Sequence, residues 1–148
     1  MELWELSARE SIRETEAAYS RFVDSGRFDE LLALFSEDAQ LDIDGEMPLV
    51  GRAAIRSYLS RVGEALAKDR TVPLIRHMTS NLHIAVASPE EARAECYFVA
   101  ITEEGVDHWG RYRDRLVPFG DRWVFTYRRV RTDGMRPDGW AAHRAANR

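Results

Sequence analysis

The residues best suited to chemistry stand in one stretch, residues 76–86, in which polar and apolar side chains alternate. Positions 77, 79, 81 and 83 carry histidine, threonine, asparagine and histidine, whereas the even-numbered positions are mostly apolar. Successive side chains of a β-strand point to opposite faces, so the pattern predicts a strand with one polar face. That face either meets water or lines a cavity, and we expect a cavity with His77 as its working group.

A histidine in a cavity suits acid–base catalysis. Its unperturbed pKa of about 6.5 lets it accept and donate a proton near neutral pH. A carboxylate bonded to one ring nitrogen fixes the tautomer and stabilises the imidazolium. Asp24 is our candidate for this carboxylate, because it ends the first predicted helix, where a negative charge opposes the helix dipole and needs a reason. A plain turn over Asp-Ser-Gly at 24–26 is the alternative.

Helices are predicted to position this pair in the first half of the chain. Ser7 and Glu10 form a capping box, so we expect a first helix from Ser7 to about Asp24, ended by Gly26. Apolar residues recur at helical spacing through it, with Tyr19 on the apolar face. The following segments predict a short helix at 28–35, a turn at 36–38, a strand at 39–43, a loop at 44–48, a third helix after residue 51 and a polar loop at 68–73.

The second half of the chain has strand patterns instead. Four strands are predicted, at residues 74–87, 92–103, 109–119 and 122–132, with turn-forming residues between them. Helices followed by an antiparallel meander predict an α+β fold, with the helices packed on one face of a curved sheet. We expect a single domain over residues 1–134 and a C-terminal tail over 135–148, held down by Trp140.

The composition sets limits on partners and compartment. The chain has 148 residues, 45% hydrophobic and 31% charged, which suits one domain. A net charge of -4 argues against nucleic acid and anionic membranes as partners. The single cysteine, Cys96, excludes an internal disulfide and is expected in the core. Because no apolar run could span a bilayer and the start lacks signal-peptide features, we expect a cytoplasmic protein.

Several motifs in a fixed order resemble one known family. They are Asp-Ser-Gly-Arg-Phe at 24–28, Leu-Phe-Ser-Glu-Asp-Ala at 34–39, Gly-Arg-Ala-Ala-Ile at 51–55, Arg-His-Met at 76–78 with Asn81, Gly-Arg-Tyr-Arg-Asp-Arg-Leu at 110–116, and Trp123 with Arg128. The ordered set is similar to the SnoaL-like branch of the nuclear transport factor two-like superfamily. The resemblance implies a cone-shaped, mainly antiparallel mixed sheet of the cystatin-like α+β barrel type, with about three N-terminal helices closing an apolar pocket.

The resemblance also implies roles for three residues. Asp24 and His77 match the aspartate and histidine of the dehydratase and dehydrochlorinase members, and Tyr19 matches a tyrosine that bile acid dehydratases place beside that pair. The Asp-Arg-Asp set of the epoxide hydrolases has no clear counterpart here, and neither has the two-aspartate pattern of the steroid isomerases. Because fold alone licenses no chemistry, these roles depend on the residues themselves.

The leading hypothesis is a cofactor-independent lyase or isomerase of the dehydratase, double-bond isomerase or cyclase type, acting on a small apolar, cyclic substrate. His77 would be the base and later the acid, Asp24 would orient it, and Tyr19 would polarise an oxygen. The alternative is a non-catalytic domain that binds a small ligand or mediates oligomerisation. A homo-oligomer, dimer or trimer, is expected under either hypothesis, because superfamily members associate through the open sheet.

Further candidates for lining the pocket are Asn81, Tyr97, Tyr112 and Arg128. Sheet packing is the alternative for the first three, and a cross-strand ion pair with Asp114 is the alternative for Arg128. We interpret His83 as a solvent-facing strand residue and His108 as a turn residue. No metal site is predicted, since no paired histidines stand at helical spacing and no acidic ligands cluster.

Overall fold

The computed structural model describes residues 1–68 and 75–147, with side chains described outside 66–68. The first helix, α1 (Leu3–Ser25), buries one stripe of its surface, including Ala8, Ile12 and Tyr19. Its N-cap is Glu2 rather than Ser7, so the predicted capping box is wrong and Ser7 lies inside the helix. The predicted end is confirmed, since Gly26 caps the helix with a left-handed φ of 68°.

The segment after α1 differs from the prediction. Helix α2 (Phe28–Leu32) stops three residues early, and β1 (Phe35–Ile43) covers the predicted turn at 36–38. The reason is tertiary: Phe35 is fully buried and pairs with Phe125, which holds its backbone extended against a local helical preference. A short strand, β2 (Leu49–Val50), and helix α3 (Arg52–Lys68) follow. Beyond Lys68, the predicted polar loop lies outside the described residues up to Pro73.

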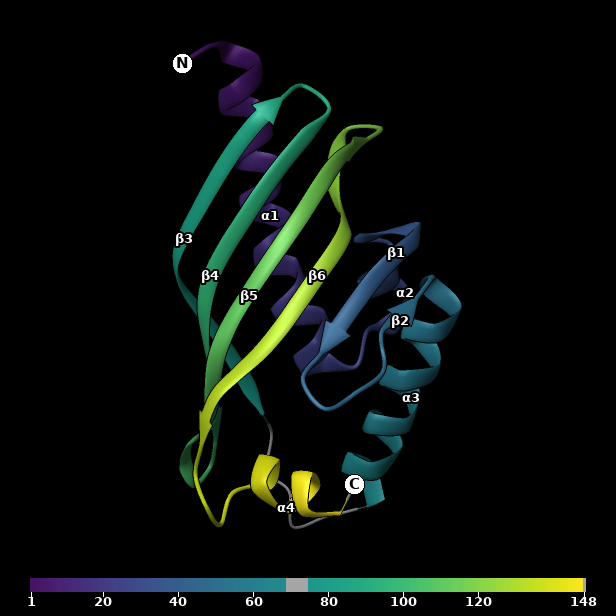
Figure 1. Ribbon diagram of the computed structural model, residues 1–148, viewed down its shortest axis with the longest axis vertical. Coiled ribbons are helices and arrows are strands. Elements are labelled where there is room, and N and C mark those ends of the chain that lie inside the picture. The colour runs from purple at the N-terminus through teal and green to yellow at the C-terminus, as the bar shows by residue number, and fades with distance from the viewer. Residues whose placement is uncertain (69–74, 148) are drawn as a thin grey trace.

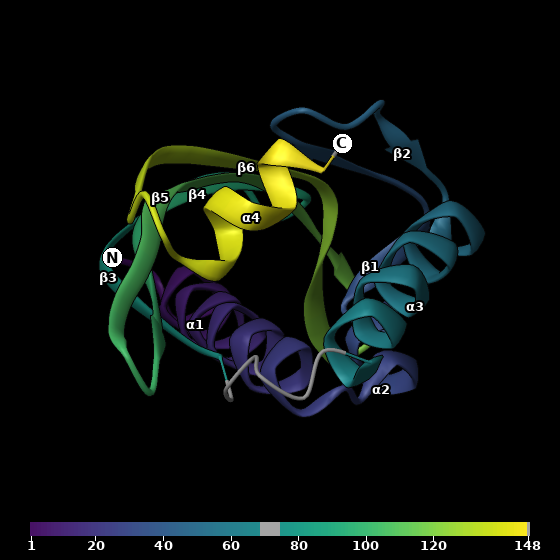
Figure 2. The same ribbon diagram turned by 90° about the horizontal axis from the view of Figure 1, so that it is seen from below.

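Four long strands confirm the predicted meander: β3 (Arg76–Ser88), β4 (Glu91–Thr102), β5 (Gly105–Phe119) and β6 (Arg122–Met135). The sheet order is β2-β1-β6-β5-β4-β3, antiparallel except where β1 runs parallel to β6. The six-stranded sheet is curved and unclosed, and α1 lies along its concave side (Figure 1). Seen from below, the sheet arches over α1 while α3 stands on the opposite side of the opening (Figure 2).

The last helix, α4 (Trp140–Ala146), lies across that opening in Figure 2. The sequence predicted only a tail over residues 135–148. In the structure β6 extends to Met135, and the chain then turns back so that α4 contacts β5. The terminal segment is therefore built into the wide end of the cone.

Two irregularities in the strands decide which side chains face inward. In β3, Asn81 and Leu82 stand opposite the single residue Cys96, and Asn81 has a left-handed φ of 57°. These residues form a β-bulge. Before the bulge an odd-numbered residue, His77, faces inward, and after it an even-numbered residue, Ile84, does. In β5, Asp107 is the extra residue, because Ala100 pairs with His108 and the next residue, Ile101, pairs with Val106.

Candidate active site

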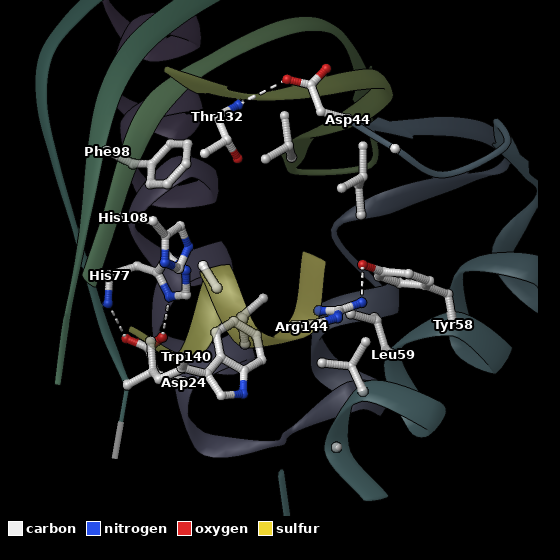
Figure 3. Close-up of a pocket in the computed structure, with 18 of the residues that line it drawn as sticks. Asp24, Asp44, Tyr58, Leu59, His77, Phe98, His108, Thr132, Trp140 and Arg144 are labelled. Carbon is white, nitrogen blue, oxygen red and sulfur yellow. Dashed lines mark hydrogen bonds and ion pairs between the residues drawn. The ribbon is translucent and has the colours of Figure 1, made fainter. Parts of the chain in front are cut away.

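The concave side of the sheet encloses a cavity of about 740 Å³ at the wide end of the cone. Helices α1, α3 and α4 and the inner sides of β3 to β6 form its walls. Much of the wall is apolar, and examples are Val23, Leu59, Val62, Phe98, Val130 and Met135. Among the polar residues labelled in Figure 3, Asp24, His77 and His108 lie on one side and Tyr58 and Arg144 on the opposite side, with Asp44 and Thr132 apart from both groups.

Asp24 and His77 meet as predicted. The Asp24 Oδ1 lies 2.6 Å from the His77 Nδ1, and Asp24 Oδ2 accepts the backbone N–H of His77 at 2.9 Å. The carboxylate thus holds both the ring and the strand, and a neutral ring donates its proton from Nδ1. The Asp24 side chain is only 9% exposed and the His77 side chain 16%, and both line the cavity. Among the described residues His77 Nε2 has no hydrogen-bond partner, so its lone pair is available to a ligand.

A second histidine–aspartate pair lies beside the first. His108 Nδ1 is 2.8 Å from Asp107 Oδ2, and the ring lines the cavity 5.9 Å, centroid to centroid, from the His77 ring at an interplanar angle of 78°. The prediction that His108 is a turn residue is wrong, because it lies within β5. The bulge at Asp107 places two consecutive side chains inside the fold, which an unbroken strand could not do.

The two pairs have different electrostatic surroundings. Burial lowers the pKa of His108, and the neighbouring His77 ring lowers it further, against the opposing effect of Asp107. His108 is therefore neutral near neutral pH. Hydrogen bonds from His108 and from the backbone of α4 lower the pKa of Asp107 despite its burial. Asp107 accepts the backbone N–H groups of Trp140 at 2.6 Å and Ala141 at 3.1 Å, so one carboxylate joins α4 to His108.

Tyr19 and Tyr112 lie at the inner end of the cavity. Both are buried and line it, and their rings meet edge-on at 5.8 Å. Burial raises the pKa of Tyr19 to about 12 and that of Tyr112 well above its ordinary value, so both hydroxyls keep their protons at neutral pH. A protonated hydroxyl is what hydrogen-bond donation to a substrate oxygen requires.

Two predicted pocket residues lie outside it. Asn81 is exposed and forms the bulge in β3, where asparagine tolerates the left-handed conformation. Tyr97 is 56% exposed and is not among the residues that line the cavity. The prediction failed for Asn81 because strand parity was carried across the bulge. Two minor predictions are confirmed: His83 is exposed and Cys96 is buried.

Arg128 is also not a pocket residue, and the alternative pairing with Asp114 is correct. Arg128 is fully buried and donates from Nε and Nη2 to the two Asp114 oxygens at 2.7 and 2.8 Å. Its Nη2 also donates to Glu16, and burial raises the pKa of Glu16 to about 8. The guanidinium carbon lies 4.1 to 4.3 Å from the ring centroids of Tyr19, Tyr112 and Phe125. This ionic cluster packs behind the tyrosines and supports the inner wall.

The sequence did not predict the wall that α4 supplies. Trp140 and Arg144 line the cavity, and Arg144 Nη2 donates to the Tyr58 hydroxyl at 2.7 Å. Among the described residues that line the cavity, Arg144 is the one lysine or arginine. No group of three or more His, Cys, Asp or Glu side chains in residues 1–68 and 75–147 is arranged to hold a metal ion. No helix within the same residues is long and apolar enough to cross a membrane.

A curved, unclosed sheet with helices around an internal pocket defines the class of NTF2-like proteins with a cystatin-like fold. The model of the SnoaL-like domain matches residues 4–129, and the chain belongs to this family. A comparison with curated proteins found no match.

Solved structures show the same fold. A protein from Novosphingobium aromaticivorans described as "Putative Scytalone Dehydratase" is 27% identical, with 90% of this chain and 89% of that chain covered and a TM-score of 0.77. An NTF2-like protein with a cystatin-like fold from the same organism is 27% identical over 97% and 90%, with a TM-score of 0.75. Rv3472 from Mycobacterium tuberculosis, of unknown function, is 28% identical over 86% and 73%, with a TM-score of 0.70.

Proposed function

We propose that the protein is a lyase or isomerase that moves a proton on a small, apolar, cyclic substrate by side-chain acid–base chemistry. The observation that carries the proposal is the Asp24–His77 pair, whose free ring nitrogen borders an apolar cavity of about 740 Å³. A cavity of this volume suits a molecule of two or three fused rings. The likeness to a protein described as "Putative Scytalone Dehydratase" supports the same class of reaction.

His77 is the proposed base. Its Nε2 takes a proton from a carbon next to a carbonyl or leaving group, and Asp24 stabilises the imidazolium that forms. In a dehydration the electron pair of the C–H bond forms the new C=C double bond, and the C–O bond breaks. The imidazolium gives its proton to the departing oxygen, which leaves as water. In an isomerisation the proton returns to a different carbon. The Tyr19 hydroxyl, which stays protonated, donates to the oxygen that gains charge.

The neutral state of His108 assists this cycle. A second imidazolium 5.9 Å away would oppose proton uptake by His77, and the lowered pKa of His108 removes that repulsion. The Asp107 carboxylate holds the proton of the neutral ring at Nδ1, so Nε2 is left as an acceptor for a substrate hydroxyl. We therefore assign His108 a role in binding the substrate and His77 the role in proton transfer.

The experiment follows exchange of the α-protons of 2-tetralone, a cyclic ketone of suitable size, by NMR in D₂O. We expect the protein to accelerate exchange and His77→Ala to reduce the acceleration by about 100-fold or more. Asp24→Asn should retain more activity than His77→Ala, because the ring remains present. His83→Ala, an exposed histidine of the same strand, is the matched control and should exchange at the wild-type rate.

A second candidate function has its own supporting observation. Asp24 also accepts the His77 backbone N–H, so the pair has a structural use in joining the end of α1 to β3. A domain that binds a ligand without catalysis would need the Asp24–His77 pair only for this structural contact. Equal exchange by the wild-type protein and His77→Ala, together with a large loss of melting temperature in the variant, would favour it and overturn the catalytic proposal.

A further inference from the structure

Opposite the histidines, the cavity has a cationic side that the proposed proton transfer does not use. Arg144 reaches it from α4, and its guanidinium carbon lies 5.5 Å from the ring centroids of both Tyr58 and Trp140 (Figure 3). The Tyr58 hydroxyl accepts from Arg144 Nη2, which leaves the hydroxyl proton for another acceptor. Within the described chain, Arg144 Nε and Nη1 make no hydrogen bond.

A second cavity, of about 490 Å³, adjoins the first at this point. Tyr58, Val62, Trp140 and Arg144 line both cavities, so the guanidinium stands at their boundary. The second cavity is more polar and adds Arg61 and His143. The Arg61 guanidinium carbon lies over the Tyr58 ring, 6.0 Å from its centroid. A ligand whose rings fill the apolar cavity can therefore place a polar substituent at Arg144, next to a second cavity that Arg61 and Glu46 also line.

We propose that Arg144, with the Tyr58 hydroxyl, binds a carboxylate or an equivalent planar monoanion on the substrate. A guanidinium edge matches the two oxygens of a carboxylate, and the hydroxyl supplies a further donor. An acidic neighbour limits the charge that this place accepts. Glu46 Oε1 forms an ion pair with Arg144 Nη2 at 3.7 Å and offsets part of the guanidinium charge, so a dianion such as a phosphate monoester meets more repulsion there than a monoanion.

This inference rests on the proposed function only in that the same cavity holds the substrate. It names the part of the substrate that lies away from the histidines: an acidic group attached to an apolar ring system. The arrangement also orients the substrate, because an anion held by Arg144 directs the opposite edge of the rings toward His77 and His108 on the far wall.

The test uses three probes of one ring system: 2-naphthoate, its neutral analogue 2-naphthamide, and 2-naphthyl phosphate. Isothermal titration calorimetry at pH 7 gives the Kd of each. We expect the wild-type protein to bind naphthoate at least 10-fold more tightly than naphthamide, and naphthyl phosphate more weakly than naphthoate. Arg144→Met should abolish the preference for naphthoate and leave the Kd of naphthamide within about twofold.

Two further variants separate the roles of charge and fold. Arg144→Lys keeps the charge without the planar fork and should retain part of the preference. Arg113→Met removes an arginine from the exposed face of β5 and should bind all three probes as the wild type does. Melting temperatures show whether each variant folds.

Equal affinities for naphthoate and naphthamide in the wild type, or an unchanged preference in Arg144→Met, would overturn the proposal. Tighter binding of naphthyl phosphate would overturn the assignment to a monoanion. The outcome is distinct from that of the proton-exchange test, because His77→Ala should keep the full preference for naphthoate. Loss of that preference in His77→Ala would show that the anion lies at the histidines instead, which also overturns the proposal.

Discussion

Replacing Glu16 by glutamine is expected to stabilise the protein above about pH 5, and the gain should increase with pH. Glu16 is buried beside Arg128, which already holds the Asp114 carboxylate through two hydrogen bonds. Two ionised carboxylates on one guanidinium would leave a net negative charge in the core. Asp114 has the better geometry, so the cluster takes up a proton on Glu16, and burial raises the pKa of Glu16 to about 8.

The size of the effect follows from linkage. The folded protein holds the Glu16 proton up to about pH 8, whereas the unfolded chain releases it near 4.5, so unfolding releases a proton between these values. This contribution to stability is fully present below pH 4.5 and is lost as pH rises toward 8. The loss is about 1.4 kcal/mol per pH unit, which amounts to roughly 3 kcal/mol at pH 7 as an upper bound. Glutamine keeps a neutral acceptor for Arg128 and has no such loss.

The measurement is guanidinium chloride unfolding of the wild type and Glu16→Gln at pH 5, 6, 7 and 8. The free energies of unfolding should be similar at pH 5 and diverge as pH rises, in favour of the variant. Glu14→Gln removes an exposed carboxylate from the same helix and is the control, with no divergence expected. A Glu16→Gln protein that is less stable than the wild type at pH 7 and 8 would refute the reasoning, because it would mean that the cluster needs an ionised Glu16.

Three further substitutions test other parts of the structure. Asp107→Asn removes the charge that raises the pKa of His108, so that pKa should fall further below its ordinary value; imidazole NMR titration measures it, and an unchanged pKa would count against the pair. Gly110→Ala should destabilise the fold by about 3 kcal/mol or more, because a Cβ there overlaps the carbonyl oxygen of Arg131 on the adjacent strand. Gly120→Ala, which meets no atom but has a φ of +63°, should cost only about 1 kcal/mol; similar denaturation midpoints for the two variants would contradict this account.

The sequence predicted what local pattern controls. The helix end at Gly26, the four long strands and the approach of Asp24 to His77 follow from turn residues, periodicity and a family resemblance carried by short motifs. Each depends on residues close together in the chain or on motifs kept in a fixed order.

The features that were missed depend on contacts between distant segments. A bulge is a mismatch between two strands, and no property of residues 104–108 alone shows that Asp107 is the extra one. The wall formed by α4 depends on Asp107, more than 30 residues before it, accepting backbone N–H groups of the helix. Arg128 was a candidate for lining the pocket, with an ion pair to Asp114 as the alternative, and its second acidic partner, Glu16 on α1, is not evident from the sequence pattern. An adjacent Asp-His pair after a glycine turn was the one signal in the sequence for His108.

The bulge at Asn81 has a consequence for comparing this chain with its relatives. Two residues stand opposite one at this place, so the halves of β3 follow different frames. A relative that lacks the additional residue would turn its leading histidine to the solvent, even if every letter of the motif were kept. An alignment that matches only the histidine would then group proteins whose histidines point in different directions. Counting the residues from that histidine to the next buried aliphatic side chain, which is Ile84 here, would distinguish the two kinds of protein.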